Sequence, residues 1–260
     1  MPAHMRWVQG SLEGSDMRRS IAIATTATAS LLLGSAAFAQ SADYDFSGFD
    51  RVDIATGLDA RITQGDSFSV RAESRSQDAL DHLQISVDGG TLTARFEQSF
   101  LDFIISGGLV GQLLNSGNAI TIDITMPALA GVTASSGADV GVIAVTSERL
   151  ELDASSGADI KVTDAVLGHA IVSASSGSDI EISGSADTVE ADASSGSDID
   201  ADDLVASNVA AEASSGANVS VHATAGIKAD ASSGGDIEVR GNPADRDVDT
   251  SSGGDVSFDD

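Results

Sequence analysis

The chain has 260 residues, with 40 Asp and Glu against 13 Lys and Arg, so its net charge is -27 at pH 7 and its pI is about 4.1. This charge argues against binding to nucleic acid or to an anionic membrane surface, and it favours solubility, cation binding or a basic partner. Because the sequence has no Cys, disulfides, thiolate metal sites, a cysteine nucleophile and a lipid-modified N-terminal cysteine are excluded.

The N-terminal region is predicted to be an export signal. Residues 1–16 form an upstream extension that we expect to be disordered. Segment 17–39 joins a basic start, an apolar run over 21–33 and the small-residue pattern Ala37-Phe38-Ala39 before Gln40. This combination is typical of a cleaved secretory signal peptide; the alternative is a retained membrane anchor, for which the run is only just long enough. We therefore expect a mature chain from residue 40, without a transmembrane span, in the periplasm or at the cell surface.

Residues 40–126 are predicted to form a less regular N-terminal part of the fold. Alternating apolar residues and turn signals predict strands over 49–54, 58–64, 68–73, 85–87, 92–96 and 119–126, and about two helical turns over 77–83. Gly65-Asp66 suits a hairpin-like turn between the second and third strands. The apolar insert 99–118 is expected to cap an end of the fold, with an exposed patch for a partner or membrane as the alternative.

From residue 127 to 260 one phrase recurs: Ser-Ser-Gly, a small residue, Asp or Asn, then Ile or Val. Successive copies are 20, 20, 19, 20, 18 and 19 residues apart. A fixed period of this length is the signature of a solenoid, and the alternation around each copy is that of a strand with one buried face. We predict an all-β, single-stranded parallel β-helix with about 18–20 residues per coil and seven regular coils. The copies start at Ser135, Ser155, Ser175, Ser194, Ser214, Ser232 and Ser251.

Stacked coils turn each position of the phrase into a column. Continued alternation places the second Ser of each copy inside, so we expect an internal ladder of hydroxyls. The Gly column allows a tight corner. The acidic column faces outward and attracts cations, since carboxylates about 4.8 Å apart repel one another by roughly 0.9 kcal/mol even in water. Its candidate cation ligands are Asp139, Asp159, Asp179, Asp198, Asp236 and Asp255.

The order of motifs resembles the bacterial auto-transporter adhesin head, or GIN, domain family. The carrying segments are Gly-Leu-Asp-Ala-Arg-Ile-Thr-Gln-Gly-Asp at 57–66, Asp-Gly-Gly-Thr-Leu at 88–92 and Ile-Asp-Ile-Thr-Met-Pro-Ala-Leu at 122–129, followed by the Ser-Gly-Ala-Asp copies. The resemblance covers nearly all of the chain after residue 40. It implies an exported β-solenoid, a right-handed parallel β-helix, and it carries no catalytic residues over to this sequence.

The residues that could carry chemistry do not form a recognisable catalytic motif. The four His residues are far apart in sequence, no G-x-S-x-G elbow occurs, and the densest acidic cluster is Asp200, Asp202 and Asp203. A carbohydrate-active β-helix enzyme stays an alternative by analogy of fold. Calcium is the best cofactor hypothesis, because the repeat keeps the Gly-x-Asp of a calcium β-roll, although one Asp per coil supplies few of the six or more oxygens needed.

We therefore predict a non-enzymatic exported β-helix that uses an acidic surface as an adhesin-like or structural binding protein of the bacterial cell envelope. Its partner would be a protein or glycan of the envelope, not nucleic acid. Self-association through the C-terminal coil is an additional possibility. The alternatives are the carbohydrate-active enzyme and a calcium-stabilised repeat protein. The predicted contact face consists of Ser155, Gly157, Asp159, Ser175, Gly177, Asp179, Ser194, Gly196 and Asp198.

Overall fold

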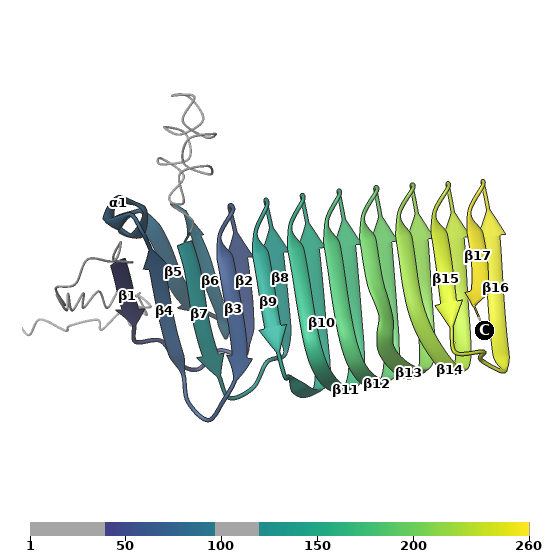
Figure 1. The fold of residues 1–260 in the computed structure, drawn as a ribbon, viewed down its shortest axis with the longest axis horizontal. Helices are drawn as coiled ribbons and strands as arrows, with labels where there is room; N and C mark the ends of the chain where they lie inside the picture. The colour runs from purple at the N-terminus through teal and green to yellow at the C-terminus, as the bar shows by residue number, and fades with distance from the viewer. Residues whose placement is uncertain (1–39, 97–119, 260) are drawn as a thin grey trace, which may run out of the picture.

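The computed structural model describes residues 40–96 and 120–259. These residues form an elongated solenoid in which each winding crosses two layers of strands (Figure 1). One layer, here called layer A, contains the strands that lead into the Ser-Ser-Gly corners, and layer B contains the strands that leave them. The upstream extension (1–16), the signal peptide (17–39) and the apolar insert (99–118) lie outside the described residues, so those assignments stay predictions.

The strands of the two layers follow the predicted alternation. Layer A contains β5 (Leu83–Asp88), β6 (Thr91–Phe96), β2 (Arg51–Ala55), β8 (Gly131–Ser135), β10 (Thr146–Ser155) and β16 (Asp245–Ser251). Layer B contains β1 (Gln40–Tyr44), β4 (Ser69–Ser74), β7 (Ile120–Met126), β3 (Asp59–Gln64), β9 (Asp139–Ile143), β15 (Asp236–Arg240) and β17 (Asp255–Asp259). Four long strands bend from layer B into layer A: β11 (Asp159–Ser175), β12 (Asp179–Ser194), β13 (Asp198–Ser214) and β14 (Asn218–Ser232).

Neighbouring windings are parallel, and equivalent residues of the phrase are partners. Ser155 is paired with Ser135 and Ser175, and Asp159 is paired with Asp139 and Asp179. The predicted all-β solenoid of stacked parallel strands is confirmed. The seven Ser-Ser-Gly corners enclose about six full windings, whereas seven regular coils were predicted. Among the described windings, register shifts lie on the side opposite the corners, for example between Val162 and Ala165. This bend therefore absorbs the variation in winding length between 18 and 20 residues.

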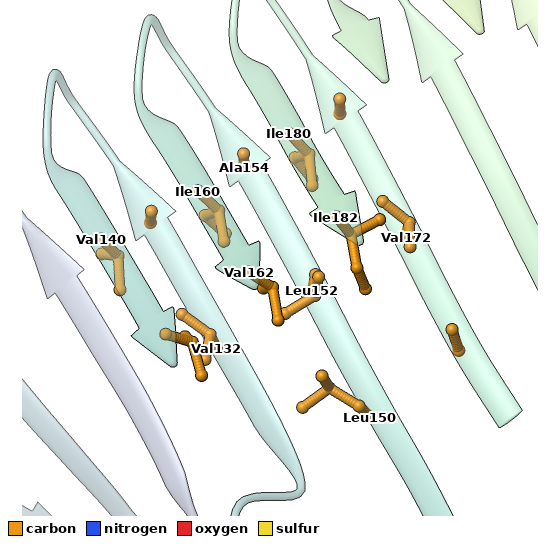
Figure 2. Close-up of a cluster of buried hydrophobic side chains, with 14 of the residues drawn as sticks. Val132, Val140, Leu150, Leu152, Ala154, Ile160, Val162, Val172, Ile180 and Ile182 are labelled. Carbon is orange, nitrogen blue, oxygen red and sulfur yellow. The ribbon is translucent and has the colours of Figure 1, made fainter. Parts of the chain in front are cut away.

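The core lies between the two layers. Figure 2 shows Val132, Leu152 and Val172 of layer A facing Ile160 and Ile180 of layer B. Each of these side chains is at most 2% exposed, and burial of such a side chain contributes about 1.5–3 kcal/mol. The layer A column of Val132, Leu152 and Val172 continues as Ala191, Ala211 and Ala229, so the side chains at this position are smaller in the later windings.

The predicted internal ladder of second Ser hydroxyls is wrong. Ser156 is exposed, as are its six equivalents, and it has a φ of +57° beside Gly157 at +70°. Two consecutive positive φ angles are those of a type I′ turn, and the amide N–H of Gly235 donates to the carbonyl of Ser232 across such a corner at 2.9 Å. Because the turn places two residues outside both layers, the alternation resumes unchanged after it. The exposed second serines are Ser136, Ser156, Ser176, Ser195, Ser215, Ser233 and Ser252.

The buried hydroxyls are found two residues further along the chain. Ser178 and Ser197, at the small-residue position of the phrase, are fully buried. The Ser178 hydroxyl donates to the carbonyl of Ala154 at 2.8 Å, and the Ser197 hydroxyl donates to the carbonyl of Ala174 at 2.9 Å. Each therefore links two neighbouring windings. In other copies the same position is Ala or Gly, so the hydroxyl is an optional addition to a site that requires a small residue.

The N-terminal part has a winding order that differs from the chain order. β2 and β3 lie between the windings made by β6–β7 and β8–β9, and they are parallel to both. Thr56 and Gly57 have positive φ angles and donate to Ser135 and Ser136, so they form an eighth corner. The predicted strand–turn–strand over 85–96 is confirmed as antiparallel β5–β6. The hairpin predicted at Gly65-Asp66 is wrong, because both edges of β3 are occupied by β7 and β9.

The two ends of the solenoid are built differently. At the N-terminal end, β4 and then β1 add antiparallel strands beyond β7, and α1 (Gln77–Asp81) buries Ala79 and Leu80. At the other end, all seven residues of β16 are exposed, and Arg246 stacks on Phe258 at 4.0 Å. Self-association through this C-terminal coil stays a prediction. No helix in the described ranges is long and apolar enough to cross a membrane.

We predict that Gly157→Ala destabilises the protein by about 1–2 kcal/mol, because Ala at a φ of +70° brings Cβ too close to the backbone. Urea unfolding measures the change. Gly141→Ala is the matched control: Gly141 lies in β9 without a positive φ, and the added Cβ has no neighbour closer than 3.9 Å. The control should be neutral or stabilising by up to about 1 kcal/mol; equal destabilisation by both substitutions would contradict the assigned corner geometry.

Candidate functional site

The predicted contact face forms a continuous ridge along the corners. Its Ser members are half-buried, whereas its Gly and Asp members are exposed. The parallel register aligns Ser155 with Ser175, and Ser175 with Ser194. The Asp residues follow the corner turn of each winding, and they are aligned in the same way at the start of the layer B strands. The structure thus brings together all nine residues chosen from the sequence, and their role as a contact face stays a prediction.

The acidic column of layer B, here called the B ladder, is longer than the sequence phrase indicated. Asp59 is paired with Asp139 in the same register, directly after the corner at Thr56-Gly57. The recurring phrase does not include Asp59, because Ala55 and Thr56 replace its two Ser residues; the Gly-x-Asp of residues 57–59 was the available signal. The ladder contains Asp59, Asp139, Asp159, Asp179, Asp198, Asn218, Asp236 and Asp255.

The stacked carboxylates of the B ladder disfavour one another's charge. The pKa of Asp159 is raised by partial burial and by the charge of Asp139, and the pKa of Asp179 is raised by partial burial and by the charges of Asp159 and Asp198. A backbone N–H from the following Asp opposes each shift. Asn218 relieves the repulsion locally, because its amide nitrogen donates to the Asp198 carboxylate at 2.7 Å. A cationic partner would lower the same repulsion along the whole ladder.

A second acidic column lies on layer A, two residues before the first Ser of each phrase. We call it the A ladder. Most of its members are exposed, and only Ser173 and Asp230 are half-buried. The pKa of Asp192 is raised by partial desolvation and by the charges of Glu212 and Glu190. The ladder and the adjacent Ser column line a shallow groove of about 410 Å³. Sequence reasoning missed it because Ser173 interrupts the acids. The ladder contains Asp153, Ser173, Asp192, Glu212, Asp230 and Asp249.

The acidic cluster at 200–203 is occupied by internal interactions. Asp202 forms an ion pair with Arg240, and its backbone N–H donates to the Asp200 carboxylate at 3.4 Å. His222 contacts the carbonyl of Asp202 through Nδ1 at 3.3 Å. Partial burial and the charge of Asp200 raise the pKa of Asp202. These contacts link neighbouring windings at the bend opposite the corners.

Metal binding remains a prediction for the six Asp residues of the B ladder. Within residues 40–96 and 120–259, no group of three or more His, Asp or Glu side chains is arranged to hold a metal ion. Stacking places the carboxylates in a row, whereas calcium requires six or more oxygens around one point. The proposed calcium effect is testable by melting the protein in calcium, in magnesium and in chelator. A midpoint raised by calcium alone supports a specific site, and equal midpoints in the three solutions reject it.

Comparison with known proteins identifies the family. Residues 48–243 match the family described as "Putative auto-transporter adhesin, head GIN domain". The chain belongs to this family. The match therefore covers the N-terminal part from residue 48 onward together with the first five full windings, and it includes the motifs at 57–66, 88–92 and 122–129. No curated protein matches the sequence.

Solved structures share the fold of this GIN domain. A "putative adhesin" from Bacteroides fragilis has a TM-score of 0.74 at 18% identity, over 85% of this chain and 97% of its own. A "putative lipid binding protein" from Parabacteroides distasonis has a TM-score of 0.65 at 17% identity, over 85% and 97%. A "putative adhesin" from Parabacteroides merdae has a TM-score of 0.64 at 14% identity, over 85% and 96%. At these identities the likeness concerns the fold alone.

The raised carboxyl pKa values predict that acidification stabilises this fold before it denatures it. A raised pKa means that the folded state binds more protons than the unfolded chain just above pH 3.8, the ordinary Asp value. Stability contributed by these groups therefore falls as pH rises through the folded pKa. We expect a higher melting temperature near pH 5 than near pH 7 at low salt, and a smaller difference at about 1 M salt.

Asp179→Asn isolates the contribution of the B ladder. This variant should melt higher than the wild type near pH 7 and should show a smaller gain on acidification, because the charge between Asp159 and Asp198 is removed. Asp66→Asn is the control, since Asp66 is exposed and belongs to neither ladder. If both variants respond to pH as the wild type does, repulsion within the ladder does not govern the pH dependence.

Proposed function

We propose that this GIN domain is an exported, non-enzymatic binding module of the bacterial cell envelope that contacts a positively charged partner along its corner ridge. The observation that carries the proposal is the pair of acidic ladders that flank the corners. The B ladder lies on one side of the Ser and Gly columns, and the A ladder lies on the other. Nearly every winding therefore repeats the same pattern of negative charge and hydroxyl groups along a straight rod.

The repetition favours an extended or polymeric partner. Each winding advances the pattern by one strand spacing, about 4.8 Å, so a partner with regularly placed ammonium groups could contact several windings at once. Single exposed ion pairs contribute only about 0–1 kcal/mol. Useful affinity therefore requires several contacts made together, which a rigid rod provides without ordering flexible loops. A polyamine glycan and a basic protein segment both have this chemistry.

The export part of the proposal rests on the N-terminal segment and on the family. Segment 17–39 has the pattern of a cleaved signal peptide, and the family description is that of an auto-transporter adhesin head. Strand β1 begins at Gln40, immediately after the predicted cleavage point. Cleavage there would leave the described strand intact, so the processed chain could keep every contact seen in the fold.

The binding proposal is tested with two probes, a decalysine peptide and a glucosamine oligomer, on the immobilised full chain. We expect at least one of them to bind, with an affinity that falls steeply with salt. The triple variant Asp159→Asn, Asp179→Asn and Asp198→Asn should lose that binding and keep its melting transition.

A matched triple variant removes the same charge elsewhere. Asp45, Asp66 and Asp88 are exposed and belong to neither ladder, so their replacement by Asn should leave binding within about twofold of the wild type. Equal losses in the two triple variants would show that net charge, and not the ridge, is responsible. Failure of both probes to bind the wild type would overturn the proposed contact.

A further inference from the structure

Gly141 in β9 is a glycine that the fold does not require. Among the glycines in the described residues, it is the only one with neither a positive φ nor a neighbour within 3.4 Å of an added Cβ. The nearest atom to such a Cβ would be the carbonyl oxygen of Ala60, at 3.9 Å. A strand-interior Gly costs about 0.5–1 kcal/mol relative to Ala. Such a glycine often marks a close approach by a ligand or another backbone.

The missing side chain leaves a slot on the outer face of layer B. Arg61 of β3 and Lys161 of β11 are the register partners of Gly141 on its two sides. Each of them is drawn away from Gly141 by an acid on the next strand: Arg61 by Asp123 at 3.7 Å, and Lys161 by Glu181 at 2.6 Å. The aliphatic stems of both side chains therefore form the walls of a depression of about 280 Å³.

The ends of the slot differ in polarity. Toward the corner, the carboxylates of Asp59, Asp139 and Asp159 form the rim. Toward the opposite bend, the next outward residue of β9 is Ile143, whose surface is 54% exposed. A ligand in the slot therefore meets the hydrocarbon stems of Arg61 and Lys161 on its two faces and negative charge at the edge toward the corner. Ile143 lies just beyond the residues that line the depression.

We propose that this slot binds a tyrosine or tryptophan side chain of a protein partner. An aromatic ring has flat apolar faces and a positive edge, so its faces pack against the stems of Arg61 and Lys161, and its edge suits the carboxylates. A phenol O–H or an indole N–H donates to the rim, which an aliphatic side chain cannot do. A free anion is disfavoured, because five carboxylates surround the two cations. A ring placed over Gly141 would also shield the glycine backbone from water, as a side chain at this position would do.

This inference rests on the proposed binding function, since it names one side chain of the partner, but its test does not depend on finding that partner. The full chain, labelled with ¹⁵N, is titrated with N-acetyl-tyrosinamide, N-acetyl-tryptophanamide and N-acetyl-leucinamide. We expect the two aromatic amides to shift the Gly141 amide resonance with a Kd of the order of 1–10 mM, and the leucine amide to leave it unchanged. Equal shifts with all three amides would overturn the proposal.

Variants at the slot give the second readout. Gly141→Val should fill the slot and weaken aromatic binding at least about tenfold, while melting at or above the wild-type temperature, since Val suits an exposed strand. Lys161→Ala removes the stem that forms one wall of the slot, and should weaken binding about two- to fivefold. Ser220→Val is the control, because Ser220 lies in the same outward row on β14, and it should bind as the wild type does.

The outcomes separate this proposal from the proposed function. If Gly141→Val binds the aromatic amides as tightly as the wild type, the slot is not the site and the proposal is overturned. The ridge triple variant could lose decalysine or glucosamine binding while the wild type shows no response to the aromatic amides. That result would support the proposed function and would overturn the proposed aromatic slot. An aromatic response that disappears in Gly141→Val but persists in Ser220→Val supports the slot, whatever the ridge binds.

Discussion

The whole molecule depends on one backbone constraint, the pair of left-handed residues at each corner. Ser156 and Gly157 show the pattern: both have positive φ angles, and together they reverse the chain within a four-residue turn. Such a turn fixes where each strand ends and where the next begins. Because equivalent corners lie directly over one another, the inter-winding hydrogen bonds pair Ser with Ser and Asp with Asp along the rod. Variation in length is confined to the opposite bend.

The same constraint determines the electrostatics. Strict register forces identical residues into contact across windings, so an acid in the repeat becomes a ladder of acids that raise one another's pKa. The chain tolerates this because the ladders are largely exposed, where water screens the repulsion. It also interrupts each ladder once, with the Asn218 amide beside Asp198 in the B ladder and with Ser173 between Asp153 and Asp192 in the A ladder. The charge that remains is available to a partner.

Much of this fold could be predicted from the sequence, because period and alternation are local properties that the chain repeats. The errors occurred where the local pattern has two readings. Alternation alone does not distinguish a continuing strand from a two-residue turn, and so Ser156 was expected inside. Local sequence signals also do not determine which strands will be neighbours in a sheet. The position of β2–β3 between β6–β7 and β8–β9 therefore could not be predicted. The recurring Asp of the phrase predicted the B ladder. The A ladder was not predicted, because Ser173 interrupts its row of acidic residues.

In a repeat protein, the departures from the repeat carry the most specific information. Every winding has an outward-facing residue two places after the B ladder position, and these residues form a row. From β11 to β17 each member of the row is a charged residue or a Ser. In β9 it is Gly141, at a place where neither the backbone nor any neighbour requires glycine. Stability alone would favour a side chain there. The ridge can give affinity through repetition, but repetition cannot define a single position along the rod. A unique slot beside the ridge can fix where a partner is placed.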